Sequence, residues 1–148
     1  LFLAGVVMAA AIALHNLPEG MVIGASYAAD LAEAGQDGRM MALVIGLHNI
    51  PEGMAVAVPL AAGGASRGRA VLTTAVAGAP TVLGAVLGFC LGTMGPGLQM
   101  LTLGGASGAM LYVVFGELLP ESFRLCRSPA PVMAAVLGVL TGMGVVLG

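Results

Sequence analysis

The sequence predicts an all-α fold in which a single domain, residues 1–148, forms a polytopic bundle of about five transmembrane helices. The chain is 59% hydrophobic and only 8% charged, whereas an ordinary soluble domain is about 25% charged. A soluble domain could not cover its surface with so few charges, so the composition places the chain in a lipid bilayer. Backbone groups in lipid must be hydrogen-bonded within the protein, and the alternating pattern of a barrel is absent, so helices are predicted.

Each of the apolar segments is long enough to cross roughly 30 Å of hydrocarbon at about 1.5 Å per helical residue. The connections between them are short and are either polar or rich in Gly and Pro. The expected spans are residues 1–29, 40–62, 70–92, 97–118 and 131–148.

Glycines recur at every fourth position in the last three spans, and small residues at that spacing let helices approach closely. They are Gly84, Gly88, Gly92, Gly104, Gly108, Gly138 and Gly142. The pattern predicts a tightly packed bundle.

The charges of the loops predict the orientation in the membrane. The second and fourth loops carry arginine pairs, the first loop is mainly acidic and the third has no charge. By the positive-inside rule, the second and fourth loops face the cytoplasm, so the chain starts inside and ends outside the cell (inner or plasma) membrane. The arginines are Arg67, Arg69, Arg124 and Arg127.

Two classes of function have no support in the composition. The chain has no lysine and its five arginines form no basic tract, so nucleic acid is not an expected partner. Cys90 and Cys126 lack the spacing of a metal site and imply no disulfide framework.

The most informative feature is an internal repeat, HNLPEG at residues 15–20 and HNIPEG at residues 48–53, each near the middle of its span. An ionisable residue at the bilayer centre costs at least ~2.5 kcal/mol. The His and Glu of each motif are four positions apart and therefore share one helix face. Pro18 and Pro51 remove one helical hydrogen bond each and loosen the helix at the same place.

The two motif helices are expected to be antiparallel, which brings both motifs to a similar depth. Two imidazoles, two carboxylates and two amide oxygens would then converge, and a divalent cation would satisfy them all. Mixed nitrogen and oxygen ligands suit Zn²⁺, Fe²⁺, Mn²⁺, Co²⁺ or Cd²⁺ better than Cu⁺. The alternative is a pair of hydrogen-bonded clusters that hold two helices together. The candidate metal ligands are His15, Asn16, Glu19, His48, Asn49 and Glu52.

These motifs resemble the ZIP (Zrt/Irt-like) family of divalent metal transporters, in particular its bacterial broad-specificity and GufA-like branch. The resemblance implies that the chain is helices four to eight of an eight-helix fold, with the N-terminal helices absent. It also implies transport of divalent cations, zinc first, into the cytoplasm. The family orientation agrees with the arginine pattern.

Carried over by position, the family assigns one metal to His15, Glu19, His48 and Glu52. A second metal would use Asn16 and Asn49 and share the two glutamates. Many members add a glutamate before a proline in the sixth helix, where this chain has Ala79 before Pro80. Two carboxylates then face two dications, so we expect one tightly held metal. Near the inner exit, the resemblance places the acidic residues Glu117 and Glu121.

Other functions are an intramembrane zinc metalloenzyme and a ligand-free helical scaffold. The enzyme would favour HExxH and a separate general base, which the chain lacks. We therefore expect a transporter, not an enzyme, with no catalytic or cofactor-binding residues and with the metal as transported substrate. The expected partners are the metal ion, the bilayer and the N-terminal helices of the same protein, and a homodimer is left open.

Overall fold

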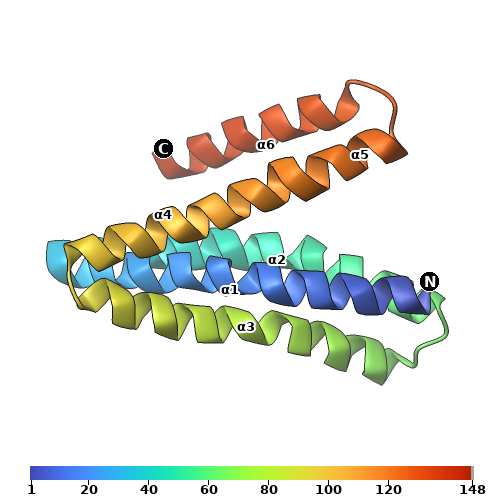
Figure 1. The fold of residues 1–148 in the computed structure, drawn as a ribbon, viewed down its shortest axis with the longest axis horizontal. Coiled ribbons are helices and arrows are strands. Elements are labelled where there is room, and N and C mark those ends of the chain that lie inside the picture. The colour runs from blue at the N-terminus through green and yellow to red at the C-terminus, as the bar shows by residue number, and fades with distance from the viewer. Residues whose placement is uncertain (148) are drawn as a thin grey trace. The chain divides into compact units, whose positions relative to one another are not determined.

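The computed structural model describes residues 1–147, except for the side chains of residues 117, 118, 121, 125 and 145–147. The described chain is helical between its loops, which confirms the predicted all-α class (Figure 1). The elements are α1 (Phe2–Glu33), α2 (Asp37–Ala62), α3 (Arg67–Thr93), α4 (Pro96–Tyr112), the π-helix η1 (Val113–Leu118), α5 (Leu119–Leu125) and α6 (Ala130–Leu147).

Four of the predicted spans are helices long and apolar enough to cross a membrane. They are Phe2–Glu33, Asp37–Ala62, Arg67–Thr93 and Pro96–Gly116. The fifth is a shorter apolar helix, Ala130–Gly144 within the described residues. The first four expected spans agree with these long helices, because helices satisfy the backbone groups in lipid, and the fifth stays a prediction as a full span.

The fourth span differs from a regular α-helix near its end. The backbone is π-helical over Val113–Leu118, and the N–H of Leu119 donates to the carbonyl of Val114, five residues earlier. Pro120 follows at once, and proline has no N–H to donate and clashes with the carbonyl four residues before it. The wider turn accommodates this proline without ending the helix.

The chain divides into two compact units, Leu1–Met110 and Leu111–Gly148. In the first unit α1 packs against both α2 and α3, and its contact with α3 is the more extensive. In the second unit α5 contacts η1 and α6.

The contact between α1 and α3 depends on glycine. A Cβ atom built on Gly20 would overlap the carbonyl oxygen of Thr81, and one on Gly84 would overlap that of Leu17. A Cβ atom on Gly24 or Gly88 would likewise overlap a backbone carbonyl oxygen of the opposite helix, and one on Gly92 would lie 2.7 Å from the Cβ of Ala28. The predicted close packing is therefore confirmed for α3. It is not seen for the repeated glycines of α4 and α6, where a Cβ would meet no atom within 4 Å in the described structure.

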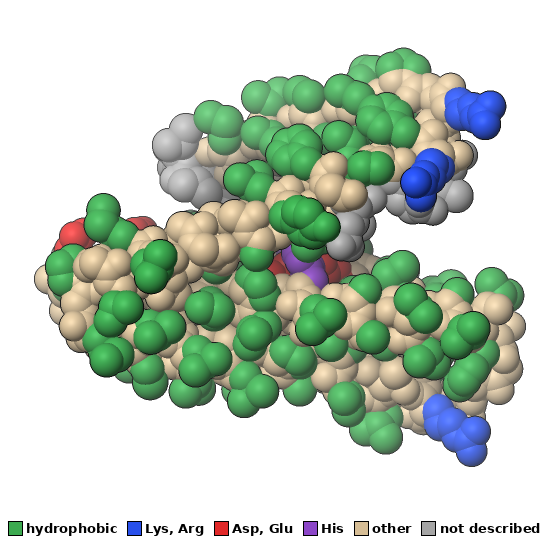
Figure 2. Space-filling view, viewed as in Figure 1, with side chains coloured by type: hydrophobic (Ala, Val, Ile, Leu, Met, Phe, Trp, Pro, Cys, Tyr) green, Lys and Arg blue, Asp and Glu red, His purple; other side chains and the backbone are tan. Residues whose placement is uncertain are grey.

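The core of the first unit is small and is made mostly of short side chains. It contains Ala9, Val56, Leu60, Ala70 and Ala77. Most large apolar side chains lie outside it, and Figure 2 shows hydrophobic side chains over much of the visible face. A surface of this kind suits contact with lipid or with other helices.

Candidate metal centre

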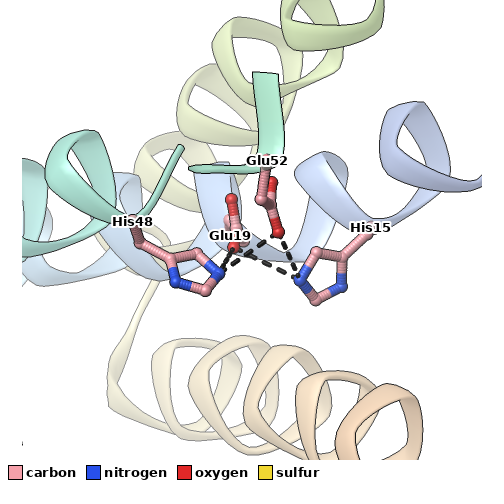
Figure 3. Close-up of side chains that lie close together, drawn as sticks. All are labelled: His15, Glu19, His48 and Glu52. Carbon is pink, nitrogen blue, oxygen red and sulfur yellow. Dashed lines mark ion pairs between the residues drawn. The ribbon is translucent and has the colours of Figure 1, made fainter. Parts of the chain in front are cut away.

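The first two helices carry one motif each, and the three-residue connection between α1 and α2 makes them antiparallel neighbours. His15 and Glu19 extend from α1, and His48 and Glu52 extend from α2, toward one point (Figure 3). One ligand atom from each of the four residues lies within 4.8 Å of the other three. The structure thus brings together four of the six residues that the sequence predicts as ligands.

Four contacts connect the two imidazoles to the two carboxylates. Within each helix, His15 Nε2 lies 3.3 Å from Glu19 Oε1, and the matching distance in the second motif is 3.2 Å. Between the helices, His15 Nε2 lies 3.5 Å from Glu52 Oε1, and His48 Nε2 lies 3.5 Å from Glu19 Oε1. Each nitrogen therefore faces both carboxylates.

These distances fit a shared ion. In a tetrahedral zinc site with bonds of about 2.1 Å, neighbouring ligand atoms lie about 3.4 Å apart. Neither carboxylate oxygen of Glu19 has a hydrogen-bond partner, although both are buried. The contacts therefore fit the edges of a coordination shell better than ordinary hydrogen-bonded pairs.

Burial differs across the cluster. The side chain of Glu19 is 0% exposed, whereas the imidazole of His48 is 54% exposed. A buried carboxylate without a hydrogen bond is strongly unfavourable unless a cation compensates its charge. The buried charge of Glu19 is therefore the strongest indication that a cation binds here. In the described chain, the cluster is accessible on the side of His48.

The two asparagines lie beside the cluster, along a cavity of about 80 Å³. The Nδ2 atom of Asn16 donates to the carbonyl oxygen of Ala77 on α3 at 2.9 Å. The Oδ1 atoms of Asn16 and Asn49 and the Oε2 atom of Glu52 are buried without a partner. The cavity is large enough for water, and it is lined by Ile12, Asn16, Asn49, Glu52, Gly53, Val56, Thr74 and Gly78.

The residues of α3 that line this cavity are not among the site residues predicted from the sequence. Thr74 and Gly78, four positions apart on α3, line it, whereas Ala79 is exposed and does not. The hydroxyl of Thr74 donates to the carbonyl of Ala70 at 2.8 Å, as an ordinary intrahelical hydroxyl does. The signal available in the sequence was the spacing of four, which puts Thr74 and Gly78 on one helix face.

The acidic residues expected near the inner exit lie in the second unit. The backbone of Glu117 belongs to η1 and that of Glu121 to α5. Their side chains lie outside the described residues, so their part in an exit path stays a prediction.

Comparisons with known proteins agree with the motif resemblance. The family described as ZIP zinc transporter matches the chain over residues 1–148. The chain is also 40% identical over 114 residues to the zinc transporter GufA of Myxococcus xanthus, an alignment that covers 77% of this chain and 44% of that protein. The chain thus spans less than half the length of this relative. No solved structure matches the chain. The chain belongs to the ZIP zinc transporter family, which is a family of transporters and not of enzymes.

Proposed function

We propose that this chain forms the metal-binding part of a transporter that moves divalent transition-metal ions, zinc foremost, into the cytoplasm. The observation that carries the proposal is the convergence of two imidazole nitrogens and two carboxylate oxygens from α1 and α2, with ligand atoms within 4.8 Å of one another. Because the alignment covers less than half of the related zinc transporter, the proposal includes further helices of the same protein that complete the transporter.

The charges of the cluster favour one dication. Glu19 and Glu52 supply two negative charges, and neutral His15 and His48 add two nitrogen ligands, so the loaded site is neutral overall. The Oδ1 atoms of Asn16 and Asn49 offer neutral oxygens at the adjoining cavity. These could help a partly hydrated ion enter or leave the four-residue site, but they cannot balance a second dication.

The same ligand set bears on the range of metals. Nitrogen and carboxylate ligands without thiolate accommodate zinc as well as ferrous iron, manganese, cobalt and cadmium. Magnesium, in contrast, prefers six oxygen ligands and keeps much of its water shell. We therefore propose selectivity among transition-metal ions that is broad, with exclusion of magnesium.

Transport requires that the site open alternately to the two sides of the membrane. The arginines of the second and fourth loops support a cytoplasmic location for those loops, and inward transport would then run from the side of the α1–α2 connection. Rocking of one helix group against another around a midplane site provides such access. Protonation of an imidazole or a carboxylate weakens ligation and aids release, because ligands must be deprotonated to bind a metal.

The direct test is metal uptake by the full-length protein in vesicles of defined orientation. Zinc should accumulate, and iron, manganese, cobalt and cadmium should compete with it, whereas a large excess of magnesium should not. The matched reference is Glu19→Gln, which keeps the size of the side chain and removes its charge. Equal zinc accumulation by the wild-type and Glu19→Gln proteins would refute the proposed function of this site.

A further inference from the structure

At the turn between α1 and α2, a carboxylate of α1 caps the first residues of α2. Ala34 ends α1 in the left-handed conformation, with φ 54°, and Gln36 precedes α2 without capping it through its side chain. The cap comes instead from Asp30, in the last turn of α1. Its Oδ1 accepts a hydrogen bond from the N–H of Asp37, and its Oδ2 accepts one from the N–H of Gly38, both at 2.9 Å.

This two-oxygen cap stabilises the start of α2 in two ways. The first N–H groups of a helix have no partner within it, and a carboxylate there also interacts favourably with the helix dipole. Because each oxygen takes a different N–H, the cap fixes the rotation of α2 as well as its position along the axis. Among the described residues, these are the two hydrogen bonds that join α1 to α2.

Two glycines near this cap, Gly35 and Gly38, leave the space that it needs. A Cβ atom on Gly35 would lie 2.8 Å from Asp30 Oδ1, so a side chain there would displace the carboxylate. A Cβ atom on Gly38 would lie 2.6 Å from the ring of Tyr27, so the start of α2 lies directly against α1. Both glycines let the carboxylate and the start of α2 reach their observed positions.

The cap also sets which residues of the two helices lie level. Along an antiparallel pair, each step back on one helix matches a step forward on the other, since both rise about 1.5 Å per residue. Counting eleven residues back from Asp30 reaches Glu19, and counting eleven residues forward from Asp37 reaches His48. The cap therefore predicts that Glu19 lies level with His48.

The same count applies to the other half of the cluster. His15 is fifteen residues before Asp30, and Glu52 is fifteen residues after Asp37. These two level pairs are the pairs that meet between the helices, each with a nitrogen-to-oxygen distance of 3.5 Å. The two halves of the metal site thus stand at equal distances from one polar cap.

We propose that Asp30 is a positioning residue for the metal site, which it serves by fixing the register of α2 against α1. This inference rests on the proposed function of the site. A shift of α2 by one residue would move His48 by about 1.5 Å along the axis and turn it by about 100°, whereas metal-ligand distances hold within about 0.2 Å. At the far end of the pair, Gly63 packs against Phe2, so loss of the cap loosens the register without separating the helices.

The test compares Asp30→Ala and Asp30→Asn in the full-length protein. Alanine removes both acceptors, whereas the asparagine amide keeps one carbonyl oxygen and should restore part of the effect. Glu33→Ala is the control, because Glu33 is an exposed carboxylate near the same turn. Binding is measured with Zn²⁺ by calorimetry and with Co²⁺ by visible absorption, whose intensity reports how tetrahedral the site is.

We expect Asp30→Ala to weaken Zn²⁺ binding by about tenfold to 100-fold, the range for residues that orient metal ligands, and to lower the intensity of the Co²⁺ bands. Asp30→Asn should fall between it and the wild type, and Glu33→Ala should match the wild type. Wild-type affinity and spectrum in a well-inserted Asp30→Ala protein would overturn the inference. If Asp30→Ala does not insert, an Asp30→Asn protein identical to the wild type overturns it equally. A wild-type protein that binds Co²⁺ but transports nothing refutes the proposed function alone, because binding still tests Asp30.

Discussion

Glu19 and His48 meet between two helices, with Glu19 Oε1 lying 3.5 Å from His48 Nε2. The carboxylate is fully buried and comes from α1, while more than half of the imidazole surface is exposed and the residue comes from α2. Glu19 has no hydrogen-bond partner in the described structure. A cation bound between the two helices would compensate this buried charge.

Removal of either carboxylate should abolish uptake without preventing membrane insertion. Glu19→Ala or Glu52→Ala leaves a loaded site with an uncompensated positive charge in a region of low dielectric, where such charge is strongly disfavoured. We expect uptake to fall by more than about 100-fold, since the loss exceeds that for residues outside the ligand shell. Uptake is measured as initial rate per inserted protein, with Glu33→Ala as the matched control. Normal uptake by both inserted variants would contradict the site assignment.

The site should hold one metal tightly, not a balanced pair. Two dications carry four positive charges, and Glu19 with Glu52 supplies two negative ones. Native mass spectrometry and calorimetry on the full-length protein should therefore find one zinc of high affinity. Two metals bound with similar affinity would show that another acid completes the site.

A carboxylate added to the cavity wall should strengthen binding of a second metal. Gly78 lines the cavity, and a Cβ atom there would meet nothing within 4 Å, so Gly78→Asp has room. The family resemblance suggests Ala79→Glu for the same purpose. Because Ala79 is exposed and outside the cavity lining, we expect the smaller gain from it. Calorimetric stoichiometry of the two variants decides between the positions.

The orientation predicted from the arginines can be tested by labelling. Cysteines introduced at Gly68 and at Gln36, in a background of Cys90→Ser and Cys126→Ser, should react with impermeant reagents from opposite sides. We expect labelling of position 68 only from the cytoplasmic side and of position 36 only from outside. Both positions are exposed, so burial does not limit the reaction. The reverse pattern would refute the orientation and the proposed inward direction.

The close contact between α1 and α3 should tolerate no side chain at its centre. A Cβ atom on Gly20 would overlap the carbonyl oxygen of Thr81, and a backbone oxygen cannot move without separating the helices. Gly20→Ala should lower the free energy of unfolding by at least about 2 kcal/mol. The control is Gly46→Ala on α2, where the added methyl meets nothing within 4 Å. Denaturation in detergent should show a loss for the first variant and none for the second.

Local features of the site could be predicted from the sequence because helix geometry is regular. A spacing of four puts His15 and Glu19 on one face whatever surrounds the helix. The short connection then made an antiparallel partner the natural expectation. The same reasoning could not identify the acceptor of Asn16, because the carbonyl of Ala77 lies sixty-one positions away on α3. Nor could it show which repeated glycines contact a neighbour, since this depends on the facing helix.

By itself, the sequence determined that the chain is helical and lies in a membrane, that it carries two equivalent ligand motifs and that it resembles the ZIP family. These properties depend on composition, on residue spacing and on motif identity, which are local. The tertiary structure alone decided the pairing of Glu19 with His48, the burial of Glu19, the cavity beside Asn16 and the cap from Asp30. Each depends on the register and the separation of two helices, and these follow from the sum of many contacts along their whole length.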